Sequence, residues 1–338
     1  MDALLSKFQN KRSRSRKDMR SYANSVFTRC QLERTEYIDT GIAEAFERIK
    51  KYRDFDEDFR QWQLLTSELG VPEGHWGYIA QLTYIEKGVL APEPLLRSAA
   101  NGYYLTAVEY HRFCTSVQKT GSVVNTWWWS TITAFKLVPM LLAGLKSEAD
   151  ELYHANATAW RTTWVNRSHS FIGDFLVLLY GRYLGVIEPP FAAEIQINMR
   201  KTAPFPYTAI LDNWDSPDTE LVATMLQTLC DHQVEQAVLG GKKCYFEFNG
   251  GIYTYLPLTA LLLMKLRALR GLANPQFSHP GFGDVSALFE QVSTAFSEYV
   301  GLHQITRIED AADEELNKIL ARMYSQDFDA HAIFALNI

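Results

Sequence analysis

Residues Tyr245 to Phe282 read YFEFNGGIYTYLPLTALLLMKLRALRGLANPQFSHPGF, and this stretch decides the fold class. An almost wholly apolar run begins after Pro257 and stops at Gly271. Proline is tolerated in the first turn of a helix, and glycine is common just beyond a helix end. The sequence therefore predicts a central, buried helix over Leu258–Leu269. Thr259, Arg267 and Arg270 lie close together on one narrow stripe, and little else in this segment is polar.

Two further segments show the three-to-four spacing of apolar residues that is typical of amphipathic helices. In the first, Ser147 and Asp150 fit a capping box, in which two side chains bond the free N–H groups of a helix start. In the second, Ser216-Pro217-Asp218 offers a cap, a first-turn proline and a first-turn acid, and the helix should end near Gly240-Gly241. The apolar positions are Tyr153, Ala157, Trp160 and Trp164 in the first helix, and Leu221, Met225 and Leu229 in the second.

Strand signals are few. The Val186–Ile197 segment is broken by Pro189-Pro190, and Tyr245–Phe248 with Ile252–Tyr255 fits one hairpin around Asn249-Gly250-Gly251. We therefore expect an all-α protein of roughly ten to fourteen helices, packed as antiparallel helix pairs in one large helical body, with at most one small β-hairpin. Residues 21–338 form the single predicted domain, with a soft boundary near 185–206.

The formal net charge of −6 is unevenly distributed. Residues 1–20 are basic, with a net charge of +5, which leaves −11 for residues 21–338. Such an acidic body argues against general binding to nucleic acid and is compatible with a basic protein partner. We interpret the basic segment as a solvated first helix.

The four cysteines, Cys30, Cys114, Cys230 and Cys244, are far apart and predict reduced thiols in the core. The start of the chain does not fit a signal peptide, and Phe171–Ile187, interrupted by Asp174 and Arg182, is too short to span a membrane. We expect a soluble, cytosolic protein that does not contact membranes.

No motif for a nucleophile, a bound phosphate or a metal is present, so we expect neither a catalytic site nor a cofactor. His232 and Glu235 lie three residues apart on a predicted helix, but their order is the reverse of the di-iron motif and no second pair occurs. His279 has no acidic partner near it in the sequence.

Three acidic clusters are the candidate partner-binding residues. Carboxylates are common at helix starts, where they interact well with the helix dipole, so each cluster also fits an ordinary solvated helix start. The functional alternative is a surface that attracts a basic partner and occupies its substrate groove. The clusters are Asp54, Asp56, Glu57 and Asp58; Asp212, Asp215, Asp218 and Glu220; and Glu309, Asp310, Asp313, Glu314 and Glu315.

Three adjacent tryptophans, Trp127-Trp128-Trp129, cannot all face one stripe of a helix, because successive positions lie 100° apart. Either the helix is buried around its whole girth, or one ring lies in a groove or an interface. Pro139 should break the helix that carries them.

Two parts of the chain resemble the immunity-protein 49 family of bacterial polymorphic toxin systems. One is the central Trp-bearing segment Thr126–Glu148, and the other lies in the opening stretch. The resemblance implies a cytosolic all-α protein that binds and neutralises a cognate toxin without catalysis. The matching residues of the opening stretch are Leu256-Pro257-Leu258, Leu261–Met264, Leu266, Ala268, Gly271-Leu272 and Ser278.

Two rival functions stay open at this point. The chain is also compatible with a helical-pair scaffold or adaptor that binds a different protein. The third alternative is a helical enzyme whose site is assembled from scattered residues such as His232, Glu235 and Asp174.

Overall fold

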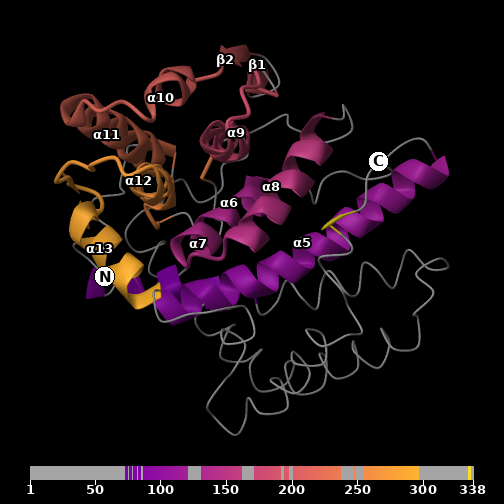
Figure 1. Cartoon of the computed structure of the whole chain (residues 1–338), viewed down its shortest axis with the longest axis horizontal. Coiled ribbons are helices and arrows are strands. Elements are labelled where there is room, and N and C mark those ends of the chain that lie inside the picture. Colours follow the sequence, from indigo (N-terminus) through magenta and orange to yellow (C-terminus); the bar gives the residue numbers. More distant parts are fainter. Residues whose placement is uncertain are drawn as a thin grey trace, which may run out of the picture.

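The computed structural model describes residues 73–74, 76–77, 79–81, 83–84, 87–120, 131–161, 171–191, 194–197, 201–236, 247–248, 255–296 and 334–335. Within these ranges helices dominate, and only two short antiparallel strand pairings accompany them, so the predicted all-α class is confirmed (Figure 1). The helices are α5 (Pro92–Thr120), α6 (Thr131–Phe135), α7 (Leu137–Leu142), α8 (Lys146–Arg161), α9 (Ile172–Leu184), α10 (Thr208–Asn213), α11 (Thr219–Gln236), α12 (Leu258–Leu269) and α13 (Val285–Phe296).

Helix α12 is the central packing element that the sequence predicts. It contacts α7, α9, α11 and α13, and every residue from 258 to 264 is buried. It ends as predicted at Gly271, whose φ of +72° is a conformation that favours glycine. The N–H groups of Gly271 and Leu272 donate to the carbonyls of Ala268 at 2.9 Å and Arg267 at 3.0 Å, which closes the helix with a Schellman motif.

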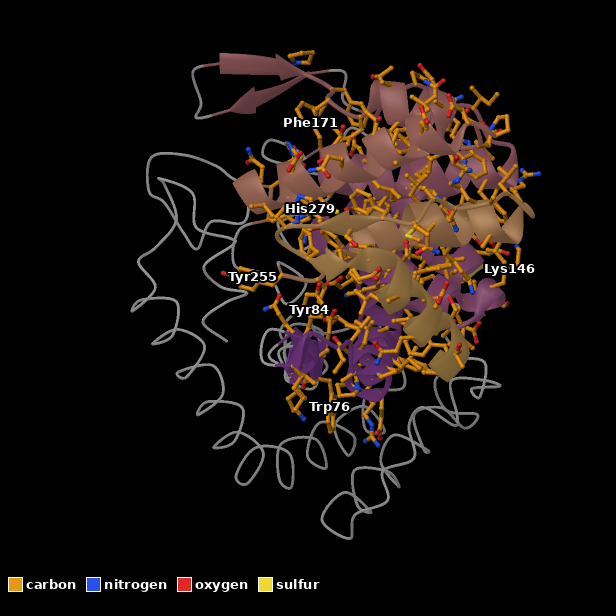
Figure 2. The ribbon with its side chains drawn as sticks, turned by 90° about the vertical axis from the view of Figure 1, so that its left-hand side faces the viewer. Trp76, Tyr84, Lys146, Phe171, Tyr255 and His279 are labelled. Atoms are coloured by element: carbon orange, nitrogen blue, oxygen red, sulfur yellow. The ribbon has the colours of Figure 1, made fainter. Side chains whose placement is uncertain are left out.

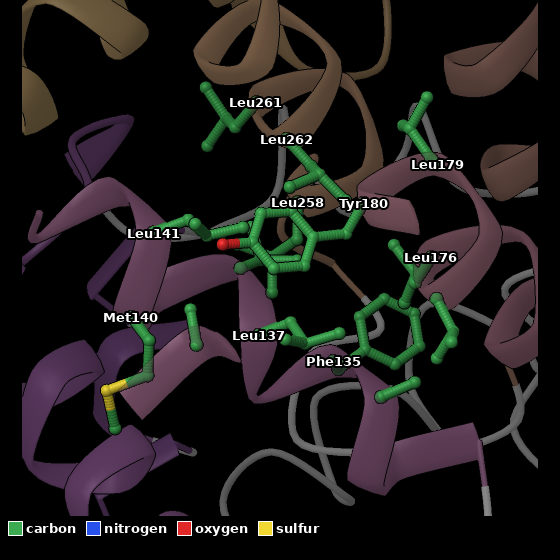
Figure 3. Packing of buried hydrophobic residues seen from close by; sticks show 14 of the residues in the cluster. Phe135, Leu137, Met140, Leu141, Leu176, Leu179, Tyr180, Leu258, Leu261 and Leu262 are labelled. Carbon is green, nitrogen blue, oxygen red and sulfur yellow. The ribbon is translucent and has the colours of Figure 1, made fainter. Parts of the chain in front are cut away.

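Helix α7 is a short, wholly buried helix beneath α12. The helix is interrupted at Lys136, between α6 and α7. Pro139 lies in the first turn of α7, where its missing N–H group costs little stability. Residues 121–130, with Trp127–Trp129, lie outside the described residues, so the prediction that Pro139 breaks the helix carrying these tryptophans stays a prediction. Figure 3 shows this core, in which Phe135, Leu137 and Leu141 lie toward Leu176 and Tyr180 of α9 and Leu258 and Leu262 of α12, whereas the Met140 side chain points away from them.

Helix α5 is the longest described helix, with 29 residues, or about 44 Å, and it runs along one side of the body (Figure 1). Its Gly102 makes room for a buried ion pair. A Cβ atom at this position would lie 2.8 Å from both Glu73 Oε1 and Lys136 Cδ. The Nζ of Lys136 lies 3.3 Å from Glu73 Oε1, and both side chains are almost fully buried.

Helices α11 and α12 form an antiparallel pair. Gln233, near the end of α11, donates to the carbonyl of Leu256 before α12, and Arg267, near the end of α12, donates to Trp214 before α11. Phe171 and Tyr255, which precede α9 and α12, both lie to the left of Lys146 in Figure 2, and Arg270, just after α12, donates to the carbonyl of Tyr183 near the end of α9. The C-terminal ends of α9 and α12 therefore come together.

The strands differ from the prediction. Strands β1 (Glu194–Ile197) and β2 (Lys201–Pro204) form an antiparallel hairpin, and β3 (Ser278–His279) pairs with β4 (Gly283–Asp284). Glu247, Phe248 and Tyr255, the described residues of the predicted hairpin, lie in turns, and 249–254 lie outside the described residues. The proline pair that counted against a strand ends before β1 begins, which leaves 194–197 free to pair with 201–204.

Both predicted helix caps are wrong. Helix α8 begins at Lys146, so Ser147 cannot be its cap, and the Asp150 carboxylate instead binds Lys146 at 2.6 Å and the Tyr180 hydroxyl at 2.6 Å. Of its apolar positions, Ala157 and Trp160 are buried, Tyr153 is half-buried, and Trp164 lies outside the described residues.

Helix α11 begins two residues after Pro217, and Asp218 rather than Ser216 caps it. Its buried face includes Met225 and Leu229, as predicted, but Leu221 is exposed. The predicted end at Gly240-Gly241 lies outside the described residues. In the part of the chain that the structure describes, no helix is long and apolar enough to cross a membrane.

Candidate protein-binding surface

The connection between α10 and α11 carries four exposed carboxylates, and we call residues 212–220 the acidic turn. The structure places Asp212 in the last turn of α10, Asp215 in the connection, Asp218 at the α11 start, and Glu220 in the first turn of α11. From residue 202 to 241 the sequence contains six acidic residues and no lysine or arginine. The cations beside these carboxylates therefore come from other helices: Arg182 of α9 and Arg267 of α12.

Asp218 has a structural role as well as a charge. Its Oδ1 accepts the N–H groups of Glu220 at 2.9 Å and Leu221 at 3.2 Å, and its own N–H donates to the Ser216 hydroxyl. These bonds satisfy donors that a helix start leaves free. Asp218 therefore fits the solvated-helix-start interpretation, whereas Asp215 and Glu220 show no such structural use of their carboxylates among the described contacts.

A buried arginine fixes the backbone of the acidic turn from behind. Arg267 of α12 has an exposed fraction of 0%, and its Nη1 donates to the carbonyls of Trp214 at 2.9 Å and Ser216 at 2.7 Å. Its Nη2 donates to the carbonyl of Ala273 at 2.7 Å. Burial lowers the pKa of Arg267, and the nearby Asp215 carboxylate opposes that shift. The fork of guanidinium donors thus ties the end of α12 to the turn.

Aromatic and cationic side chains extend this contact to the end of α9. The Arg270 guanidinium lies 5.2 Å from the Tyr183 ring centre and donates to the Tyr183 carbonyl, and the Tyr183 ring lies 6.4 Å from Trp214. Arg182 Nη2 lies 3.6 Å from Asp212 Oδ1. The ends of α9 and α12 and the acidic turn therefore form one continuous surface.

The other two predicted clusters cannot be placed, because all their members lie outside the described residues: Asp54, Asp56, Glu57 and Asp58, and Glu309, Asp310, Asp313, Glu314 and Glu315.

Of the residues of the alternative enzyme site, the structure describes the side chains of Asp174 and His232. Asp174 is buried in the first turn of α9, and the side chain of Glu235 lies outside the described residues. His232 instead has Glu247 as its neighbour, with 3.5 Å between Nε2 and Oε1. Glu247 also accepts the Tyr207 hydroxyl at 2.8 Å. Burial raises the pKa of Tyr207 well above its ordinary value, and the Glu247 carboxylate adds to the shift, so this phenol stays protonated.

His279 has the acidic partner that its sequence neighbourhood lacks. Its Nδ1 accepts the N–H of Gly281 at 3.0 Å, so Nε2 carries the proton and donates to Asp231 Oδ1 at 3.0 Å. Both ring nitrogens are occupied by hydrogen bonds that hold the β3–β4 turn against α11.

The described cysteines are buried free thiols, as predicted for Cys114 and Cys230; Cys30 and Cys244 lie outside the described residues. Burial raises the pKa of Cys114 to about 11 and raises that of Cys230 further, so neither thiol is poised as a nucleophile. No group of three or more His, Cys, Asp or Glu residues in the described ranges has the geometry of a metal site.

No known family model, curated protein sequence or solved structure matches the chain.

The contacts that sequence patterns miss here are all long-range. Arg267 lies 51 residues from Ser216, and His279 lies 48 residues from Asp231. The sequence does give a local signal for the Arg267 contact: Arg267 stands in an otherwise apolar helix, and a charged side chain that is buried there must find hydrogen-bond partners.

Proposed function

We propose that the chain is a cytosolic immunity protein that binds a cognate protein toxin and neutralises it stoichiometrically, without catalysis. The resemblance of the central and opening stretches to the immunity-protein 49 family supports the proposal, and the all-α fold is consistent with it.

The observation that carries the proposal is the acidic turn on its rigid support. Asp212, Asp215 and Glu220 are exposed, and Arg267 fixes the backbone between them through two carbonyls. A surface whose geometry is set before binding loses less conformational entropy when a partner docks.

The partner that this charge favours is basic. A toxin that cleaves or modifies nucleic acid needs a cationic groove for the phosphate backbone. Carboxylates at a fixed spacing complement such a groove and accelerate the encounter. We therefore propose a toxin directed at nucleic acid, whose groove the acidic turn occupies.

Co-expression tests the proposal directly. We expect the gene immediately upstream to encode a toxin that stops growth of a bacterial host, and growth to return when this chain is expressed with it. A neighbouring product that is harmless, or toxicity that this chain does not relieve, contradicts the proposed function.

Charge reversal tests the surface. We expect Asp215→Lys with Glu220→Lys to slow association with that toxin about tenfold at low salt, and the difference from wild type to shrink as salt screens the charges. Glu290→Lys, at an exposed carboxylate of α13, is the matched control and should leave the rate nearly unchanged. Equal slowing by both variants would assign the effect to net charge alone.

A further inference from the structure

Phe334, near the C-terminal end of the chain, packs against helix α5. Its side chain is buried, and its ring centre lies 5.1 Å from that of Tyr103 and 6.1 Å from that of Tyr110. The piece 334–335, yellow in Figure 1, lies beside α5 and α8. Its second residue, Ala335, is exposed. Of the residues that the structure describes beyond α13, it is therefore Phe334 that attaches the C-terminal segment to the body.

The two tyrosines that contact Phe334 are held in place by α8. They lie seven residues apart on α5, or about two helical turns, which places them on the same side of this helix. The Tyr103 hydroxyl donates to the Glu151 carboxylate, and the Tyr110 hydroxyl is hydrogen-bonded to the Thr158 hydroxyl. Glu151 and Thr158 are likewise seven residues apart, on α8. Two matching hydrogen bonds between the helices therefore orient both tyrosine rings.

The orientation of these rings does not depend on Phe334, because neither hydrogen bond involves it. A pair of rings that is oriented in advance loses little conformational entropy when a third ring docks on it. Aromatic rings attract each other at centroid distances of about 4.5–7 Å, and both contacts of Phe334 fall in that range. Tyr103 and Tyr110 therefore have the properties of a preformed docking site for an aromatic side chain.

We propose that Tyr103 and Tyr110 form a docking site for a phenylalanine side chain and that Phe334 occupies this site as a detachable latch. The C-terminal segment then leaves and rejoins the body while α5 and α8 stay folded. Local opening of this kind needs less free energy than global unfolding, because it breaks few contacts. Since Phe334 is tethered to its own site, a free segment of the same sequence competes poorly with it. The inference does not rest on the proposed immunity function.

A labelled peptide with the sequence of residues 330–338, AHAIFALNI, tests the site on the full-length chain. In the variant Phe334→Ala the site lacks its tethered occupant, so we expect the peptide to bind this variant at least about tenfold more tightly than wild type. A peptide with alanine in place of the phenylalanine should bind the same variant at least about tenfold more weakly. Phe191→Ala, which removes a ring packed on Trp160 and keeps Phe334, is the matched control and should bind like wild type.

Hydrogen–deuterium exchange tests detachment directly. In wild type we expect the amides of residues 334 and 335 to exchange at least about tenfold faster than those of α12, since the latch opens without unfolding the core. In Phe334→Ala, residues 103–110 should keep the protection that they have in wild type, because the hydrogen bonds to α8 still hold both tyrosines. Thermal unfolding of the variant checks that the body remains folded.

Several results overturn the latch. Equal affinity of the peptide for wild type and Phe334→Ala, or for Phe191→Ala and Phe334→Ala, would show that the site is not the one that Phe334 occupies. Equal binding of the two peptides would show that the phenylalanine ring is not what docks. Exchange at residues 334 and 335 as slow as in α12, or a Phe334→Ala variant that no longer folds, would make Phe334 a fixed part of the core.

Discussion

Lys136 and Arg267 are the two most deeply buried cations among the described residues, and their surroundings satisfy them in different ways. Lys136, between α6 and α7, lies 3.3 Å from the Glu73 carboxylate and 3.3 Å from the Thr106 hydroxyl. Arg267, in α12, has three main-chain carbonyls around it and no carboxylate among its described hydrogen-bond partners. The first is an ion pair inside the core, and the second is a cation held by backbone dipoles at the edge of a surface.

The two buried cations therefore have different structural roles. Lys136 compensates a buried carboxylate: burial raises the pKa of Glu73 above its ordinary value of 4.5, and Lys136 opposes that shift. Arg267 has no carboxylate as a hydrogen-bond partner. Instead it joins the α10–α11 connection to the segment after α12, and no main-chain hydrogen bond among the described ones links these two segments. Loss of Lys136 should therefore affect the stability of the whole body, whereas loss of the Arg267 fork should act mainly on the acidic turn.

The largest expected effect follows from Lys136→Met. Removing the cation leaves the Glu73 carboxylate buried without its counter-charge, which typically costs about 3–5 kcal/mol. Urea denaturation of the variant should therefore show a lower midpoint with an unchanged slope. The double variant Glu73→Gln with Lys136→Met removes both charges and should recover most of the loss. A double variant as unstable as the single one would show that Lys136 contributes by packing, not by charge.

Arg267→Lys tests the other side of the comparison with a smaller effect. Lysine keeps the positive charge but lacks the planar fork that reaches carbonyls of two segments, so we expect a loss of about 2–3 kcal/mol. Hydrogen exchange should accelerate at residues 212–221 more than in α5 or α8. Arg270→Lys, at the exposed arginine above Tyr183, is the control and should cost at most about 1 kcal/mol. Unchanged exchange in the acidic turn after Arg267→Lys would disprove its role as a clamp.

Local sequence patterns predict the helices well where one chemical signal dominates. The apolar run after Pro257 and the stop at Gly271 give the bounds of α12 directly. The predicted start of α11 is wrong because Ser216 and Asp218 are both good cap residues. The choice is made by Arg267, which takes the Ser216 carbonyl, so the Asp218 carbonyl accepts the first helical bond, from Val222 at 3.1 Å. A contact between residues 51 apart decides a boundary that local propensity leaves open.

The candidate surface was predictable only in its charge. Counting carboxylates identifies Asp212, Asp215 and Asp218, since charge density is a local property of the sequence. The exposure of Ile187 and Leu269 is not local, because an aliphatic residue at a helix end is buried or exposed according to which neighbour covers it. Leu221 illustrates this: its spacing from Met225 and Leu229 predicts burial, and the structure exposes it.

The third prediction extends the comparison to a charge at the surface, where the effect should be smallest. Burial alone would raise the pKa of Asp231, but hydrogen bonds from His279 and Gln227 together outweigh it and lower that pKa below its ordinary value of 3.8. A lowered folded-state pKa means that the stabilisation is present above 3.8 and is lost as the pH falls through the folded-state value. Asp231→Asn should therefore destabilise the protein at neutral pH and not at strongly acidic pH. Because the carboxylate is 63% exposed, solvent screening limits the difference to less than about 1 kcal/mol. Thermal unfolding of both proteins across this range, with Glu290→Gln as the exposed control, measures it. A stability difference between wild type and Asp231→Asn that persists at acidic pH would mean that the Asp231 side chain acts through its shape and not through its charge. The protonated carboxyl group would then hold the β3–β4 turn as well as the ionised one does.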